Sequence, residues 1–148
     1  MISGSPITLR DAGPDDCERV WQWNFAPDVR AVSKHSHEVP FTEHARWFRA
    51  RLEQPAPMWI IEEVTAAVGV VRVDPDGRIS IAIAPKARGR GIGKHAVTMA
   101  CATWGKPIVA EIDVANIASR ACFEACGFVA IHERDTFVTY RWTPEEPR

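Results

Sequence analysis

The feature that most constrains this chain is the run over residues 79–94, where two apolar segments flank a glycine-rich basic loop. The first segment, residues 79–84, is rich in isoleucine and is stopped by Pro85. Apolar residues then return with helical spacing, at Ile92, Ala96, Met99 and Ala100. The run therefore predicts a buried strand, a tight loop and a helix that starts where the loop ends.

The loop predicts an anion site. Glycines alternate with cations over Arg88, Gly89, Arg90, Gly91, Gly93 and Lys94. Glycine lets a ligand approach the backbone closely, and the first turn of a helix offers unpaired N–H groups and partial positive charge. We expect a phosphate-bearing ligand here; the alternative is a solvated basic turn that only caps the helix.

Length and charge bound the class of protein. A chain of 148 residues with 46% hydrophobic and 25% charged residues is the size and composition of a single globular domain, residues 1–148. The net charge is −1, yet residues 77–110 contain six Lys or Arg and no Asp or Glu, so this segment is +6 and the remainder is −7. This concentration favours a compact phosphate-bearing ligand over nucleic acid.

The N-terminus does not resemble a signal peptide, and no apolar run approaches the roughly 20 residues of a membrane-spanning helix. We expect a cytoplasmic protein without a membrane partner, either a monomer or a homodimer. The cysteines, Cys17, Cys101, Cys122 and Cys126, lack the paired spacing of a zinc site or a disulfide framework. The histidines at 35, 37 and 44 have no accompanying cysteine or clustered acid, so we expect no metal.

The first half of the chain reads as strand, helix, helix. Ile7 and Leu9 alternate in a strand over 6–10, and Gly13-Pro14 opens a helix with Cys17, Val20, Trp21 and Asn24 on one face. Residues 25–40 have no clear period and suggest a loop or a broken helix. Thr42 is expected to cap a helix that ends before Pro55 and buries Ala45, Phe48 and Leu52.

The second half contains most of the strands. Residues 58–64 and 67–73 read as strands that continue through a turn at 74–77 into the strand at 79–84. A strand over 109–114 follows the loop helix, and a final hairpin covers 129–134 and 136–142. Between them, Asn116 begins a helix that Gly127 closes, with a packed stripe of Ala118, Ala121, Cys122, Ala125 and Cys126. This order predicts an α/β fold with one mixed sheet of seven strands and four helices.

Three motifs together resemble the GCN5-related N-acetyltransferase (GNAT) family: residues 81–85, the loop Arg88-Gly89-Arg90-Gly91-Ile92-Gly93, and Asn116 followed by Phe123-Glu124 and Gly127-Phe128. The loop matches the family's Arg/Gln-x-x-Gly-x-Gly/Ala pattern without a gap, and the element order agrees over nearly the whole chain. The resemblance implies a mostly antiparallel sheet with splayed central strands and acetyl-CoA as cofactor.

The same resemblance assigns roles to matching positions. Backbone groups of Ile81, Ala82 and Ile83 would bind the pantetheine arm. Amides from Arg88 to Lys94, Ile92 included, would hold the pyrophosphate. Asn116 would contact the pantetheine, and Ser119 and Phe123 would line the wall near the sulfur.

The catalytic groups are not assigned by the motifs. Many family members have a tyrosine where this chain has Phe123, and phenylalanine cannot donate a proton to the leaving thiolate. Tyr140 or a water could replace it, or the thiolate could leave unaided. Candidates for the general base are His44, Glu62 and Glu63, and Cys122 is interpreted as a packed thiol.

The acceptor region spans residues 11–57. Motifs at 21–24, 29–33 and 44–48 resemble acetyltransferases that act on nucleotide-linked amino sugars, which makes Asn24, Arg30, Ser33 and His44 candidate substrate residues. A primary amine of such a small molecule is the predicted acceptor. The alternatives are a protein or ribosomal-protein N-terminal acetyltransferase and a non-catalytic acetyl-CoA sensor. A dinucleotide-binding loop, Gly91-x-Gly93-x-x-Ala96 with Asp113 downstream, is disfavoured because it lies too far from its strand.

Overall fold

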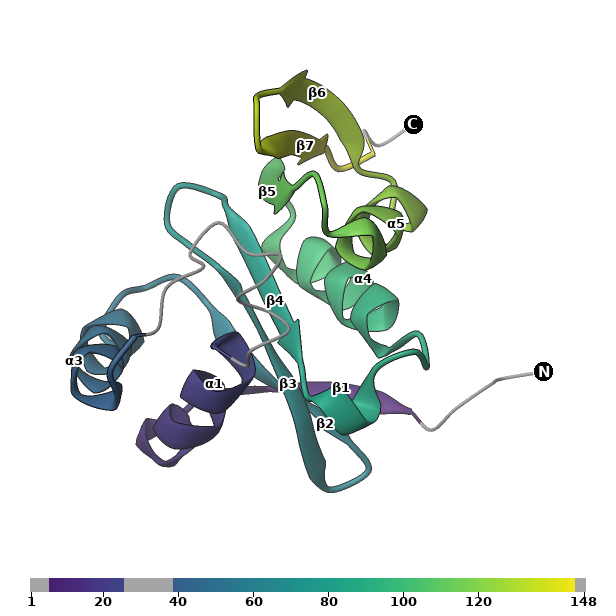
Figure 1. The fold of residues 1–148 in the computed structure, drawn as a ribbon. Helices are drawn as coiled ribbons and strands as arrows, with labels where there is room; N and C mark the ends of the chain where they lie inside the picture. Colours follow the sequence, from purple (N-terminus) through teal and green to yellow (C-terminus); the bar gives the residue numbers. More distant parts are fainter. Residues whose placement is uncertain (1–5, 26–38, 146–148) are drawn as a thin grey trace.

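Two antiparallel sheets form the frame of the protein in a computed structural model that describes residues 6–25 and 39–145 (Figure 1). The first sheet has the strand order β1-β2-β3-β4, with β1 at Ile7–Asp11, β2 at Met58–Glu63, β3 at Ala66–Val73 and β4 at Ile79–Ile83. The second has the order β5-β7-β6, with β5 at Ile108–Asp113, β6 at Val129–Glu133 and β7 at Phe137–Trp142. The seven strands agree with the sequence interpretation.

The two sheets meet at one point only within the described residues. A single parallel bridge joins Arg78 to Val109, where the N–H of Val109 donates to the carbonyl of Gly77 at 2.9 Å. The predicted mixed sheet of seven strands is thus divided into two antiparallel sheets, since β4 and β5 do not pair beyond this bridge. The gap in pairing is the splayed arrangement that the family resemblance implied.

Over residues 6–25 and 39–145, four α-helices cover the sheets: α1 (Cys17–Asn24), α3 (Phe41–Leu52), α4 (Ile92–Trp104) and α5 (Ile117–Ala125). Helices α1 and α3 lie on one face of the first sheet and α4 lies on the other, with α5 beside α4 (Figure 1). Val20, Trp23 and Phe48 pack with β2 and β3 on the α1 side, whereas Ala96, Val97 and Ala100 of α4 belong to the larger core. In the described part of the chain, no helix is both long and apolar enough to cross a bilayer.

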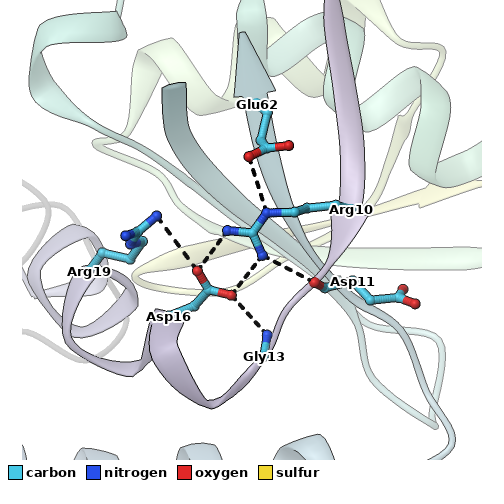
Figure 2. Close-up of polar contacts among 6 residues, drawn as sticks. All are labelled: Arg10, Asp11, Gly13, Asp16, Arg19 and Glu62. Atoms are coloured by element: carbon cyan, nitrogen blue, oxygen red, sulfur yellow. Dashed lines mark hydrogen bonds and ion pairs between the residues drawn. The ribbon is translucent and has the colours of Figure 1, made fainter. Parts of the chain in front are cut away.

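A buried carboxylate fixes the entry to α1 (Figure 2). Asp16, which is only 3% exposed, accepts hydrogen bonds from both Nη atoms of Arg10 at 2.8 and 2.9 Å and from the N–H of Gly13 at 2.8 Å. Arg10 also donates its Nε to Glu62 at 3.1 Å. The short 3-10 turn η1 (Pro14–Asp16) is thereby tied to strands β1 and β2.

Three local predictions were wrong. Helix α1 buries Trp23 rather than Trp21, whose indole N–H instead donates to the carbonyl of Val39 at 2.8 Å. Helix α3 starts after Pro40 with no side-chain cap, so Thr42 does not cap it. In α5 the alanines 118, 121 and 125 are exposed, and the buried residue is Phe123, flanked by half-buried Cys122 and Cys126.

Candidate active site

A cleft of about 630 Å³ opens where β4 and β5 separate. Strand β4 contributes residues 79–82, β5 contributes 110–113, and α5 with its N-cap contributes Asn116, Ser119 and Phe123. The opposite side is lined from the first sheet and its helices by Asn24, Phe25, Val39, Glu43, His44, Trp47, Arg72, Asp74 and Arg78. The cleft therefore brings together the predicted pantetheine strand, the α5 motif and part of the predicted acceptor region.

The glycine loop forms an anion cradle at one end of β4. Gly89 and Gly91 have φ angles of +77° and +78°, and a Cβ added at either would meet no atom within 4 Å. Among the described residues, no hydrogen-bond acceptor is paired with the N–H groups of residues 89–94. Six open amides at a helix start fit a pyrophosphate, so the loop residues suit the cosubstrate that the family resemblance implies.

Gly93 places this cradle against the cleft. A Cβ at Gly93 would lie 3.4 Å from the Sγ of Cys122 and about 4 Å from the side chains of Ile81 and Ile83. Glycine at this position lets the first turn of α4 lie close to both β4 and α5. The loop therefore lies next to β4 and α5, two of the elements that line the cleft.

Two of the loop cations already have protein partners. Arg90 makes a two-pronged ion pair with Glu63, with N–O distances of 3.0 and 3.2 Å, and Arg88 donates its Nε to the carbonyl of Ile83 at 3.1 Å. These contacts join the loop to β2 and β4. They hold the loop in shape rather than leaving every cation free for a ligand.

Asn116 has a structural role that the sequence interpretation did not include. Its Oδ1 accepts from the N–H of Ser119 at 3.1 Å and so caps α5. This leaves the side-chain NH₂ group as the part of Asn116 that can reach a ligand. Phe123, one turn after Ser119, is 2% exposed and packs edge-to-face on Phe128 with ring centroids 4.9 Å apart.

Of the three predicted base candidates, only His44 lines the described part of the cleft. Its ring is 2% exposed, and its Nε2 lies 3.0 Å from the carbonyl oxygen of Cys17. Because a carbonyl only accepts, Nε2 carries the hydrogen and Nδ1 keeps its lone pair. Burial among Phe48, Trp47 and other rings lowers the pKa of His44 below its usual 6.5, so the ring is neutral at neutral pH.

The other catalytic candidates lie elsewhere. On β2, Glu62 forms an ion pair with Arg10 and Glu63 forms one with Arg90. Tyr140 is fully buried on β7, where its hydroxyl donates to Glu124 at 2.7 Å and accepts from the Nε of Arg120 at 3.1 Å. None of the three lines the cleft, so the structure does not bring them to the predicted site. Arg30 and Ser33 fall outside the described residues.

Several cleft residues were missed by the sequence interpretation, including Arg72, Asp74 and Glu111. Arg72 interrupts the otherwise apolar strand β3, and Glu111 similarly interrupts β5. A charged residue inside a buried strand was the signal that could have found them. Within the described ranges, no group of three or more His, Cys, Asp or Glu side chains is arranged to hold a metal ion.

Comparisons with known proteins agree with this geometry. The profile of the acetyltransferase (GNAT) domain matches residues 7–129. A domain from Methanocaldococcus jannaschii superposes with a TM-score of 0.82 at 27% identity, covering 94% of this chain and 99% of that one. No curated protein gave a significant match.

Two solved structures with bound cofactor share the fold at lower identity. A putative acetyltransferase from Salmonella typhimurium with acetyl-CoA has a TM-score of 0.76 and 20% identity, covering 97% of both chains. The spermidine N-acetyltransferase of Vibrio cholerae with CoA and spermine has a TM-score of 0.78 and 16% identity, covering 93% of this chain and 95% of that one. The profile match over most of the chain decides the assignment: this protein belongs to the GNAT acetyltransferase family.

Proposed function

We propose that this protein transfers the acetyl group of acetyl-CoA directly to a primary amine of a small molecule. The observation that supports this most is the row of open backbone amides over residues 89–94, which lies next to β4, a strand that lines the cleft. Acetyl-CoA supplies an activated thioester when bound. Backbone groups of Ile81 and Ala82 at the unpaired edge of β4, together with the Asn116 amide, would hold its pantetheine arm, and all three residues line the cleft.

His44 is our candidate for the general base. The amine must lose a proton before its nitrogen can form the new N–C bond, and the unprotonated Nδ1 of His44 can accept that proton directly or through water. The bond from Nε2 to the Cys17 carbonyl fixes the tautomer and the ring orientation. A lowered pKa keeps the base free at neutral pH.

The leaving thiolate takes a proton as the C–S bond breaks. Phe123 cannot supply one, and Tyr140 is buried away from the cleft. Ser80 and Ser119 are the hydroxyl-bearing side chains that line the described cleft. We propose Ser119, which lies one turn from Phe123 on α5, or a water next to it, as the proton donor.

A small-molecule acceptor is favoured by a cleft of about 630 Å³, a volume in the range of small-molecule sites. The Vibrio cholerae relative, which was solved with spermine, supports a small amine in general terms. A nucleotide-linked amino sugar remains our specific proposal from the acceptor-region motifs, of which Asn24 and His44 line the cleft. A cytoplasmic location and a monomer or homodimer are part of the same proposal.

An amine panel tests this function. Purified protein, acetyl-CoA and a set of UDP-4-amino sugars, amino acids, polyamines and N-terminal peptides are combined, and free thiol is measured. Turnover of small amines is expected. Activity on peptides alone would replace the proposal with a protein N-terminal acetyltransferase, and CoA binding without any turnover would indicate a sensor.

A further inference from the structure

A second binding feature lies at the far end of the cleft from the glycine loop. Arg72 on β3 pairs in register with Ser80 on β4, two residues before Ala82. At about 3.3 Å per residue, this places it roughly 7 Å along β4 from Ala82, on the side away from the loop. Arg72 is thus at the acceptor end, beyond the strand positions assigned to the pantetheine arm.

The guanidinium of Arg72 is held on two sides. Its Nε donates to the Oδ1 of Asp74 at 3.1 Å, and its central carbon lies 5.0 Å from the centre of the Trp47 ring. Stacking and one hydrogen bond fix the plane of the group. Among the described residues, neither Nη atom of Arg72 has a hydrogen-bond partner. The two Nη atoms of Arg72 are therefore available to a ligand in the cleft that this residue lines.

Asp74 does not neutralise this cation alone. The same Oδ1 atom also accepts from the Nε of Arg51 at 3.0 Å, so two guanidiniums share one carboxylate. Arg51 is 4% exposed and uses its other N–H groups on the carbonyls of Ala56, Pro57 and Val73. The group of Arg51, Arg72 and Asp74 carries a net charge of +1, and both Nη atoms of Arg72 lack a partner among the described residues.

A partly buried cation with open donors favours an anionic ligand, and a planar fork favours one with two adjacent oxygens. Arg78, the second arginine that lines the cleft, does not compete with Arg72 for the anion, because it is paired with Glu111 at 3.0 Å. Burial also lowers the pKa of Arg72, which marks the incomplete compensation of its charge. Two further carboxylates, Glu43 and Asp113, line the cleft and suit the ammonium form of the acceptor.

We propose that the acceptor amine also carries an anionic group, a carboxylate or a phosphate, which Arg72 binds through its two Nη atoms. This inference rests on the proposed acetyltransferase function and narrows its substrate to zwitterionic amines, such as amino acids, aminoalkyl phosphates or nucleotide-linked amino sugars. It disfavours polyamines, which would bring only positive charge to Arg72.

Matched acceptors test the role of the anion. Rates are measured for amino acids against their amides, for an aminoalkyl phosphate against the amino alcohol, for a UDP-amino sugar against the free sugar, and for spermidine. The anionic member of at least one pair is expected to have a kcat/KM higher by about 30-fold or more, as for a charge pair truncated in a binding site. The pair that shows the effect identifies carboxylate or phosphate.

Variants connect that preference to Arg72. Arg72→Gln should bring the rate ratio within the preferred pair close to one, and Arg72→Lys should restore part of the ratio. Arg46→Gln, at an exposed position of α3, is the matched control and should keep the full ratio. Calorimetry with CoA checks that each variant keeps the cosubstrate site. A ratio near one in the wild type, or one that survives Arg72→Gln, would overturn the inference while leaving the acetyltransferase function intact.

A binding measurement separates the two proposals if no amine is acetylated. In that case the proposed function fails, and thermal unfolding with CoA and millimolar amino acid or aminoalkyl phosphate decides the role of Arg72. A higher midpoint in the wild type but not in Arg72→Gln supports the anion site. Equal midpoints with and without these ligands contradict it.

Discussion

The Nε2 atom of His44 on α3 lies 3.0 Å from the carbonyl oxygen of Cys17 at the start of α1, so the two helices are joined by a buried imidazole. Protonation would add charge to a ring that is 2% exposed, and burial accordingly lowers the pKa of His44 from 6.5. The unfolded chain therefore binds this proton more readily than the folded one. The stability that depends on neutral His44 is complete above pH 6.5 and is lost as the pH falls towards the folded pKa.

Urea denaturation checks this pH dependence. The free energy of unfolding of the wild type should fall between about pH 7.5 and pH 5, and His44→Gln, whose amide can still donate to Cys17, should flatten that part of the curve. If His44 is the general base, the same variant should also lower kcat by about 100-fold or more. An unchanged pH profile of stability would contradict a neutral buried His44.

Gly91→Trp should abolish CoA binding, with affinity reduced by about 100-fold or more. The indole would occupy the open space over the loop amides that we assign to the pyrophosphate. Gly105→Trp is the matched control, because Gly105 is at the other end of the same helix with φ +67° and open space beside it. Both changes carry a similar left-handed strain of about 1–2 kcal/mol. Calorimetry should show lost CoA affinity for the first variant only.

Phe123→Tyr should keep CoA affinity and raise turnover. The ring already lines the cleft, so a hydroxyl directed into it would supply a proton donor beside the leaving sulfur. Phe128→Tyr is the control, because its ring is 3% exposed, packs against Phe123 and does not line the cleft. That control should lose about 1–3 kcal/mol of stability to an unpaired hydroxyl and gain no activity. Loss of CoA binding in Phe123→Tyr would show that position 123 has no room for the added oxygen.

Asp16→Asn should destabilise the fold by about 3 kcal/mol, because it leaves Arg10 facing a neutral group in the network of Figure 2. Although burial opposes ionisation, hydrogen bonds from Arg10 and Gly13 hold the pKa of Asp16 below 3.8. Its contribution is therefore present above pH 3.8 and is lost as the pH falls through the folded pKa. Asp15→Asn, at the exposed neighbouring position, should cost less than about 0.5 kcal/mol in the same urea titration.

Cys126 should be the most reactive thiol. The neighbouring Cys122 thiol and the Thr98 hydroxyl favour the thiolate of Cys126 and lower its pKa, whereas burial raises the pKa of Cys101 to about 12. Iodoacetamide near pH 7 should label Cys126 first, as peptide mass spectrometry would show. Equal labelling of the two cysteines would contradict this assignment.

The sequence was sufficient for the order of elements, since the loop glycines and the proline and glycine boundaries are local signals. It was not sufficient where contacts with residues distant in the sequence determine which side chain is buried or hydrogen-bonded. The helical period of α5 was predicted correctly, but alanines 118, 121 and 125 were assigned to the buried side. Small residues tolerate either environment, so they do not identify the buried side of a helix. The bulky ring of Phe123 determines it instead. Tyr140 was considered for catalysis by residue type alone, yet its hydroxyl is engaged by Glu124 and Arg120.

Arg72 shows why an acceptor site is harder to predict than a cofactor loop. The role of Arg72 depends on Asp74, on the ring of Trp47 from α3 and on Arg51, which donates to the same Asp74 oxygen. These groups are spread over more than twenty positions of sequence, and no short motif contains them. Only the packing of α3 against the first sheet brings them together.

The single bridge between the two sheets also affects solubility. Beyond Arg78 and Val109, β4 has no strand partner on its outer side within the described residues, and an open strand edge can pair with another chain. A pantetheine arm carries amide groups of its own and would cover that edge. Acetyl-CoA would then protect the protein from self-association as well as supply its acetyl group, and we expect the cosubstrate-free protein to be the form more prone to aggregate.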